Sequence, residues 1–194
     1  MQHLFSHGLH SENWNTTTFV DFATLHRGYD LPVHARTEGA VPIIGSNGIT
    51  GHHNEAKITG PGVVTGRSGS IGISHYVEQD FWPLNTSLYV CDFHGNFPLF
   101  VHYFFEWFNF RKYATGTGVP TLNRNLVHRD SIKVPHETEQ KEIARTLAVI
   151  DTDLALHESK RVTLRDLFKM TLNKLMTRDI LVVDLDIEMK KVHA

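Results

Sequence analysis

Short apolar runs separated by turn residues occupy the first two thirds of the chain. Their β-branched and aromatic residues lie between glycine, proline and asparagine, which is typical of short strands in a compact domain. We expect strands at residues 41–44, 63–65, 71–77 and 87–91. The aromatic segment 97–113 has no glycine or proline after Pro98, which predicts a mostly buried helix. The pattern therefore predicts a mixed α/β domain.

The pattern changes near Pro135, after which apolar residues repeat at alternating steps of four and three. This seam, which His157 and Arg161 interrupt, comprises Ile143, Leu147, Ile150, Leu154, Leu164, Phe168 and Leu175. An average step of about 3.5 residues is the signature of a coiled-coil helix. A helix over residues 137–176 would be about 60 Å long at about 1.5 Å per residue, which is too long for its own domain to cover. We therefore expect it to need a partner helix.

Composition narrows the class of protein. The chain has 194 residues, 41% of them hydrophobic, so it can bury a proper core. Its one cysteine, Cys91, leaves no internal disulfide and no multi-cysteine zinc site. The first nine residues lack the cationic start and apolar run of a secretory signal, and no apolar stretch is long enough to span a membrane. A cytoplasmic protein is the expectation.

The net charge of −2 does not by itself favour nucleic acid, because a DNA-binding protein that acts alone usually carries a basic surplus. The distribution is more informative. Residues 111–129 contain four lysines and arginines and no acid, and residues 56–77 contain Lys57, Arg67 and His75 and again no acid. Basic loops on a domain of nearly zero net charge suit a subunit whose partner proteins contribute further positive charge to the phosphates. Ordinary solvated loops explain the same pattern about as well.

Motifs for catalysis are weak. Residues 60–68 resemble a phosphate-binding loop in spacing, but Pro61 stands where the first glycine belongs and Arg67 replaces the lysine. Asp130 together with residues 139–141 (Glu-Gln-Lys) loosely suggests a metal-dependent nuclease, although the latter belong to the first turns of the long helix. The adjacent pair His52 and His53 lacks a third ligand at a suitable spacing. A small nuclease remains only as an alternative.

Three polar loops, at residues 44–53, 65–70 and 115–124, carry side chains of the types that contact polyanions and base edges. Arginine makes the commonest specific contact to guanine, so Arg67 is a candidate reading residue, with a structural pairing to Glu55 or Asp80 as the alternative. Lys112 beside the aromatic helix is expected to contact phosphate. The candidate contacts are Ser46, Asn47, His52, Arg67, Ser68, Lys112, Thr117, Asn123 and Arg124.

Five segments follow one another along the chain: VPIIGSNGITG, GPGVVTGRSGSIG, FWPLNTSLYV, YATGTGVPTLNRNLV and IKVPHETEQKEIARTLAVID. In this order they closely resemble the specificity subunit of type I restriction–modification systems. The resemblance runs from Trp14 to Ile187.

The resemblance implies a target-recognition domain at residues 11–136 that reads one half of a bipartite site in double-stranded DNA. A coiled-coil helix at 137–178 would follow, then a tail at 179–194, while residues 1–10 resemble the end of a preceding helix. Such a subunit has no catalysis and no cofactor of its own. It assembles with methyltransferase subunits, which bind S-adenosylmethionine, and with restriction subunits. Because its own domain cannot cover the long helix, we further expect a homodimer through it. The different-class alternative is a coiled-coil scaffold that binds another protein and reads no DNA.

Overall fold

The computed structural model describes residues 13–116 and 118–177, so Thr117 and the segments expected at residues 1–10 and 179–194 lie outside the described residues. Contacts divide the chain into two compact units, the first ending at Leu147 and the second beginning at Ala148. The elements are β1 (Asn15–Thr18), α2 (Phe19–Phe22), β2 (Thr24–Arg27), η1 (Val33–Ala35), β3 (Val41–Gly45), β4 (Gly48–His53), β5 (Gly62–Gly66), β6 (Ser74–Val77), β7 (Trp82–Pro83), β8 (Ser87–Asp92), α3 (Pro98–Trp107), η2 (Phe110–Tyr113), β9 (Ala114–Thr115), β10 (Thr121–Leu122), α4 (Arg124–His128), β11 (Ser131–Val134) and α5 (Glu137–Met176).

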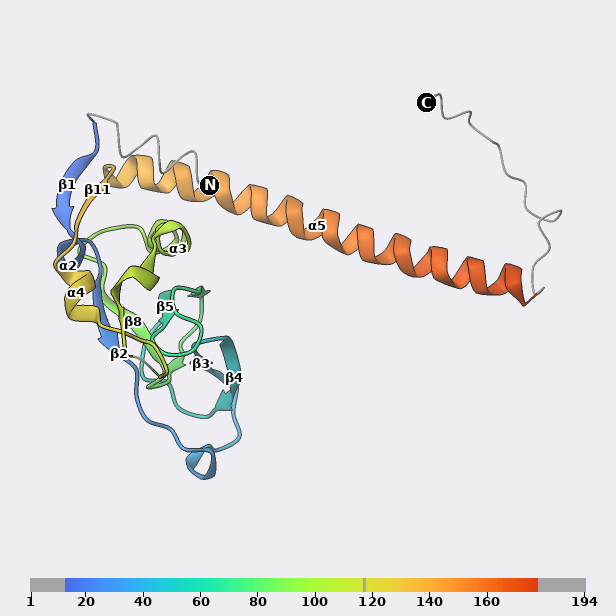
Figure 1. Cartoon of the computed structure of the whole chain (residues 1–194), viewed down its shortest axis with the longest axis horizontal. Helices are drawn as coiled ribbons and strands as arrows, with labels where there is room; N and C mark the ends of the chain where they lie inside the picture. Colours follow the sequence, from blue (N-terminus) through green and yellow to red (C-terminus); the bar gives the residue numbers. More distant parts are fainter. Residues whose placement is uncertain (1–12, 117, 178–194) are drawn as a thin grey trace. The chain divides into compact units, whose positions relative to one another are not determined.

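The first unit is a mixed α/β domain built on two small sheets (Figure 1). The four-stranded sheet has the order β2-β8-β5-β6 with antiparallel neighbours throughout. The three-stranded sheet has the order β4-β3-β7, in which β3 pairs antiparallel with β4 and parallel with β7. Two ribbons, β1-β11 and β9-β10, complete the described strands. An α/β domain followed by a long helix is the fold class that the sequence predicted.

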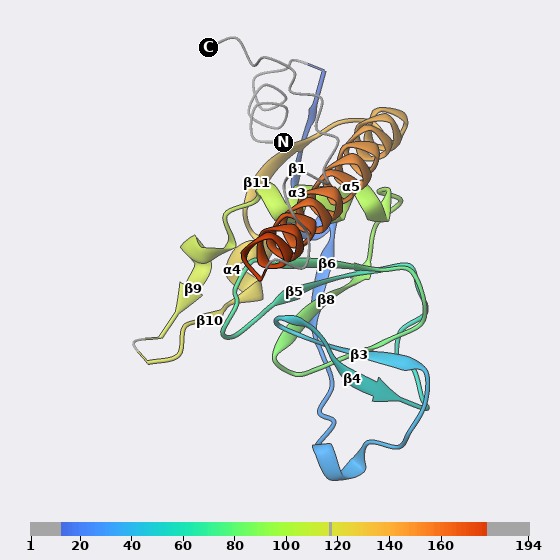
Figure 2. The same cartoon turned by 90° about the vertical axis from the view of Figure 1, so that its right-hand side faces the viewer.

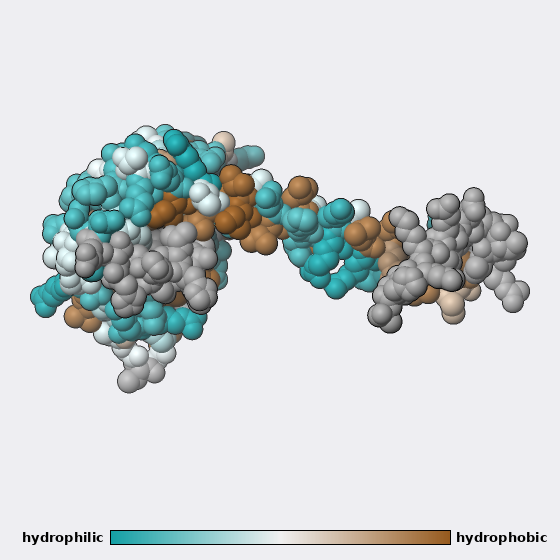
Figure 3. Space-filling model, turned by 90° about the horizontal axis from the view of Figure 1, so that it is seen from above, coloured by the Kyte–Doolittle hydropathy of each residue, from teal (hydrophilic) through white to brown (hydrophobic). Residues whose placement is uncertain are grey.

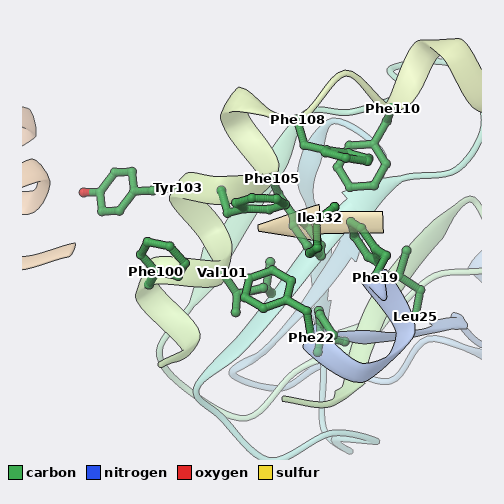
Figure 4. Close-up of a cluster of buried hydrophobic side chains, with 14 of the residues drawn as sticks. Phe19, Phe22, Leu25, Phe100, Val101, Tyr103, Phe105, Phe108, Phe110 and Ile132 are labelled. Carbon is green, nitrogen blue, oxygen red and sulfur yellow. The ribbon is translucent and has the colours of Figure 1, made fainter. Parts of the chain in front are cut away.

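An aromatic core fills the space between α2, α3 and the four-stranded sheet (Figure 4). Phe19 lies at its centre, stacked on Phe105 at a centroid distance of 5.6 Å and tilted against Phe108 at 5.1 Å. Such offset and edge contacts add about 0.5–1.5 kcal/mol per pair beyond the burial of area. This core fixes the frame from which the polar loops project.

The aromatic segment is helical for a shorter stretch than the sequence predicted. The helix α3 ends at Trp107, and a short 3-10 turn follows over Phe110–Tyr113. Phe108 and Phe110 are both buried against Phe19. Side chains two residues apart in an α-helix point to nearly opposite faces, so both rings can reach one core only because the helix has ended before them.

Two further expectations need correction. The strand expected at residues 71–77 begins at Ser74, because Gly72 adopts a positive φ of 84° and turns the chain. Residues 44–53, expected as a polar loop, form the β3–β4 hairpin, whose two-residue turn is Ser46–Asn47 between the paired Gly45 and Gly48. Asn47-Gly48 between apolar runs is a hairpin signal, which accounts for this turn.

The second unit is the continuation of α5, a single helix of 40 residues over Glu137–Met176. It begins with Glu137 and Glu139 in its first turn, where negative charge is favourable. Apolar side chains are exposed on its surface on both sides of a hydrophilic stretch (Figure 3). In the part of the chain that the structure describes, none of the helices is long and apolar enough to cross a membrane.

Candidate functional site

The loop at residues 67–73, between β5 and β6, is held by backbone contacts to two other segments. The backbone amide of Arg67 donates to the carbonyl of Thr86 over 2.9 Å, and the carbonyl of Arg67 accepts from the amide of Leu122 over 2.7 Å. Ser68 also forms an isolated bridge with Thr121 on β10. The loop is thereby held on both sides, by the turn before β8 and by the β9–β10 ribbon.

The β3–β4 turn approaches the same loop from the other side. A Cβ atom on Gly66 would come within 1.9 Å of the carbonyl oxygen of Ser70, so only glycine fits there. That position also lies 3.3 Å from Cβ of Ser46, and the carbonyl of Ser46 lies 3.4 Å from Nε2 of His75. The three polar loops at residues 44–53, 65–70 and 115–124, which are far apart in the sequence, therefore meet. Figure 2 shows the β9–β10 ribbon of the third loop beside α4.

A basic cavity of about 350 Å³ opens where these loops meet β2 and α4. Three arginines from three different elements line it, together with threonine and asparagine side chains, and no aspartate or glutamate is among its lining residues. The lining residues are Arg27, Arg67, Leu88, Thr115, Thr121, Leu122, Asn123, Arg124 and Asn125. An acid-free polar cavity with three guanidinium groups is suited to an anion.

Local contacts position the three arginines. Nη1 of Arg67 donates to the carbonyl of Asn85 over 3.3 Å. Arg27 lies 3.6 Å from a carboxylate oxygen of Asp30, which also accepts from the side-chain amide of Asn85. Arg124 begins α4 directly after Asn123, whose side-chain oxygen accepts from the amide of Asn125 over 3.0 Å. One hydrogen bond leaves most of the five N–H donors of Arg67 for a ligand.

His128, the last residue of α4, joins this helix to β2. Its Nε2 accepts from the backbone amide of Leu25 in β2 over 2.9 Å, which requires that nitrogen to be unprotonated. Burial lowers the pKa of His128, and the nearby charge of Arg124 lowers it further. The neutral imidazole therefore ties α4 to β2, the strand that carries Arg27.

This bond predicts a pH-dependent stability. Because the pKa of His128 is lowered by folding, the unfolded chain binds the proton more readily, and stability is lost as the pH falls below about 6.5. His128→Gln keeps an oxygen that can accept from Leu25 and removes the titration. We expect thermal unfolding between pH 7.5 and pH 5.5 to show a smaller loss of Tm for this variant than for the wild type.

The matched control is His34→Gln, which removes an exposed histidine on η1. Its Tm profile should follow that of the wild type. An acid slope that is equal in the wild type and His128→Gln would show that the proton is taken up elsewhere.

Of the predicted contacts, Arg67, Asn123 and Arg124 line the cavity, while Ser46, Asn47 and Ser68 belong to the loops around it. His52 is exposed on β4 opposite Pro42 and is not among the lining residues. Four further lining residues were not predicted from the sequence: Arg27, Thr115, Thr121 and Asn125. Arg27 is the last residue of β2, a strand that the sequence did not predict, and only the pairing of β2 with β8 brings it to the cavity.

Lys112 lies elsewhere, at a second cavity of about 320 Å³. Its ammonium is 3.1 Å from a carboxylate oxygen of Asp130 and lies over the rings of Phe108 and Tyr113. Burial raises the pKa of Asp130, but hydrogen bonds from Tyr113 and Lys112 outweigh it, so that the net pKa is lowered. The positive charge of Lys112 is therefore already paired within the domain.

The structural partners suggested for Arg67 are also engaged otherwise. Glu55 pairs with Lys57 at 2.9 Å, and Asp80 accepts from the amide of Gly60. The structural role of Arg67 is instead its bond to the carbonyl of Asn85.

The residues considered for a nuclease have structural roles. Glu139 accepts from the indole of Trp14 over 3.0 Å, and Lys141 pairs with Glu137 at 2.7 Å. Gln140 is 2% exposed and joins α5 to the start of α3. Among the described residues, no group of three or more histidine, cysteine, aspartate or glutamate side chains could hold a metal ion.

The seam residues of α5 fall into two groups, one covered by the domain and one exposed. Leu147 is buried in the core of the domain and Ile143 packs against it, so these two residues are covered within the chain rather than left for a partner helix. Leu175 is partly exposed. The other seam residues are exposed in the described structure: Ile150, Leu154, Leu164 and Phe168, at 47%, 61%, 55% and 67%.

Comparisons with known proteins agree with this architecture. The family model described as the type I restriction modification DNA specificity domain matches residues 11–166. No curated protein matches the sequence.

Similar solved structures include the type I restriction–modification S subunit from M. genitalium, with 21% identity and a TM-score of 0.62 over 86% of this chain and 46% of that one. The HsdS subunit from Thermoanaerobacter tengcongensis has 12% identity and a TM-score of 0.59 over 84% and 44%. A structure described for complex assembly and conformational transition of the type I R-M system has 12% identity and a TM-score of 0.66 over 84% and 46%. The chain thus spans less than half the length of these structures, and the likeness shows the fold.

Proposed function

The chain belongs to the family of type I restriction–modification DNA specificity domains, and on this premise we propose that it reads one half of a bipartite site in double-stranded DNA. The observation that carries the proposal is the acid-free cavity with Arg27, Arg67 and Arg124 at the meeting point of three polar loops. Duplex DNA offers phosphates for such a cavity and base edges for the side chains around it. The domain contributes recognition and no chemistry.

The contacts divide into positioning and reading. Arg27 and Arg124 approach the cavity from β2 and α4, and we assign them to phosphates, which fix register without sequence information. Arg67 lies beside the exposed turn, and we assign it to a bidentate contact with guanine. Ser46, Asn47, Ser68, Thr117 and Asn123 are the further proposed contacts, with His52 and Lys112 at the periphery.

The partners proposed for the chain follow from the same premise. Residues 11–136 would be the recognition domain and residues 137–178 the helix that docks methyltransferase subunits, to which restriction subunits are added for cleavage. S-adenosylmethionine would bind to the methyltransferase. The net charge of −2 supports assembly with partner subunits that neutralise part of the phosphate charge, because the chain alone offers few cations to phosphate. The exposed apolar seam supports a homodimer through antiparallel helices.

Binding-site selection with the chain in complex with its methyltransferase tests the reading role. Arg67→Ala should cost about 1–3 kcal/mol and relax the preference at one base pair. Arg27→Ala and Arg124→Ala should instead weaken all sequences about equally, and each should reduce the slope of log K against log salt by about 0.9. The chain without its partner should bind weakly and lose affinity steeply with salt.

Arg111→Ala is the matched control, since Arg111 is exposed on η2, is not among the lining residues of the cavity, and loses the same charge. An unchanged base preference for Arg67→Ala, with affinity reduced for every sequence, would assign Arg67 to positioning. Capture of a protein partner without any DNA binding would favour the scaffold alternative.

A further inference from the structure

Six consecutive positions along the exposed stripe of α5 form a pattern that is the same from both ends. Their spacing is 4, 3, 4, 3 and 4, and their character is apolar, apolar, polar, polar, apolar, apolar. The six residues are Ile150, Leu154, His157, Arg161, Leu164 and Phe168. All six are exposed in the described structure. A stripe with this symmetry is complementary to a reversed copy of itself.

The heptad positions of these six residues are those that an antiparallel pair of helices requires. If Ile150 occupies position d, then the six positions alternate d, a, d, a, d, a. In an antiparallel pair, an a position of one helix faces a d position of the other. Leu154 then faces Leu164 of the partner subunit, and His157 faces Arg161 of the partner subunit. Every apolar residue meets an apolar one, and the polar residues share one central layer.

A parallel pair of the same helices would be unfavourable. Arg161 would face Arg161 of the partner subunit at an a position. On the flanks, the contact between g and the following e would bring Asp153 near Glu158 of the partner subunit and Lys160 near Arg165 of the partner subunit. All three pairs have like charges, and each of the two flank pairs occurs twice by symmetry.

Charges on the antiparallel flanks are more favourable. Asp151 and Arg165 of the partner subunit would meet at e positions with opposite charges, again twice by symmetry. Glu158 and Lys160 would each approach its own symmetry mate near the axis. The repulsion at Glu158 is reduced because Arg161 already donates to it from two nitrogen atoms, one of them over 2.7 Å. The same pairing, which exists within one helix in either orientation, reduces the charge of the guanidinium in the central layer.

We propose that two copies of this chain, paired through antiparallel α5 helices as in the proposed function, have their two-fold axis at Ser159, and that the layer of His157 and Arg161 fixes the register. The inference rests on the homodimer in the proposed function and adds its register. A shift by one heptad would place His157 and Arg161 opposite Leu154 and Ile150 of the partner subunit. Such a shift buries polar groups against apolar ones, so a polar layer specifies register.

Single cysteines in full-length Cys91→Ser protein test the register, with a short bismaleimide as the cross-linker. Glu158→Cys and Lys160→Cys lie on the two flanks beside the axis and should each give covalent dimers. Ser159→Cys is the matched control, because position f points away from the seam, and we expect at least about tenfold less product from it. In a parallel dimer, neither flank position meets its own mate.

A dimeric protein in which Glu158→Cys and Lys160→Cys cross-link no better than Ser159→Cys would overturn the register. A chain that is monomeric at tens of micromolar by light scattering would overturn the second copy as occupant. DNA binding is measured separately, so efficient cross-linking without DNA binding would contradict the proposed reading function alone.

The role of the polar layer has its own variant. His157→Leu with Arg161→Leu makes the stripe continuously apolar, so the dimer should become at least about tenfold tighter while the register relaxes. In the Glu158→Cys background, this change should lower the yield of covalent dimer and produce cross-links in other registers or larger oligomers. An undiminished yield would show that the layer does not specify the register.

Discussion

Replacing Leu154 and Leu164 together by aspartate is expected to convert the dimer to a folded monomer. In the antiparallel pair each of these residues faces the other across the seam, so the double change places two carboxylates opposite one another at two symmetric points. Burying unpaired charge, with like charges in contact, costs at least about 3 kcal/mol per dimer, a factor of more than about a hundred in the dissociation constant. Light scattering and sedimentation at tens of micromolar would measure this.

Val149→Asp with Leu156→Asp is the matched control. Both side chains are exposed on the same helix, at 61% and 67%, but occupy c positions away from the seam. This pair adds the same charge and should leave the dimer intact. A double variant at the seam that remains dimeric would contradict assembly through this stripe, whereas loss of the dimer in both variants would mean that added charge alone weakens it.

Gln140→Leu is expected to have the largest effect on the stability of the domain. The side-chain oxygen of Gln140 accepts from the amide of Phe97 over 2.9 Å, and its nitrogen donates to the carbonyl of Pro135 over 2.9 Å and to the side chain of Asn96 over 2.7 Å. Asn96 in turn donates to the carbonyl of Phe22. The network joins α5 to the start of α3 and, through Asn96, to α2.

Leucine would leave these buried groups without a partner, at a cost of about 1–3 kcal/mol for each of the worst affected and roughly 2–5 kcal/mol in total. For a chain of this size the melting temperature should fall by roughly 5–15 °C in calorimetry. Glu142→Leu, at an exposed position two residues away, controls for the change from polar side chain to leucine and should have little effect. A fall of less than about 2 °C for Gln140→Leu would show that water replaces the lost bonds.

The sequence by itself determined the elements whose signals are local. The apolar runs at β3, β5 and β8 are short and lie between turn residues such as glycine, proline and asparagine, so their positions followed from the pattern. The start and the seam of α5 followed from Pro135, the acidic first turn and a repeat maintained over many turns. For the same reason the mixed α/β class and the polar loops with Arg67, Asn123 and Arg124 could be predicted.

Only the tertiary structure decided the features that depend on residues far apart in the sequence. Arg27 joins the cavity because β2 pairs with β8, and Lys112 is drawn to Asp130 rather than left in a basic loop. The aromatic helix stops at Trp107 because Phe108 and Phe110 both pack on Phe19, a constraint that no helical propensity contains. Gln140 is buried because three separate segments meet around it. Local pattern sets where the backbone is regular, whereas long-range packing and hydrogen bonding set which polar side chains remain for a ligand.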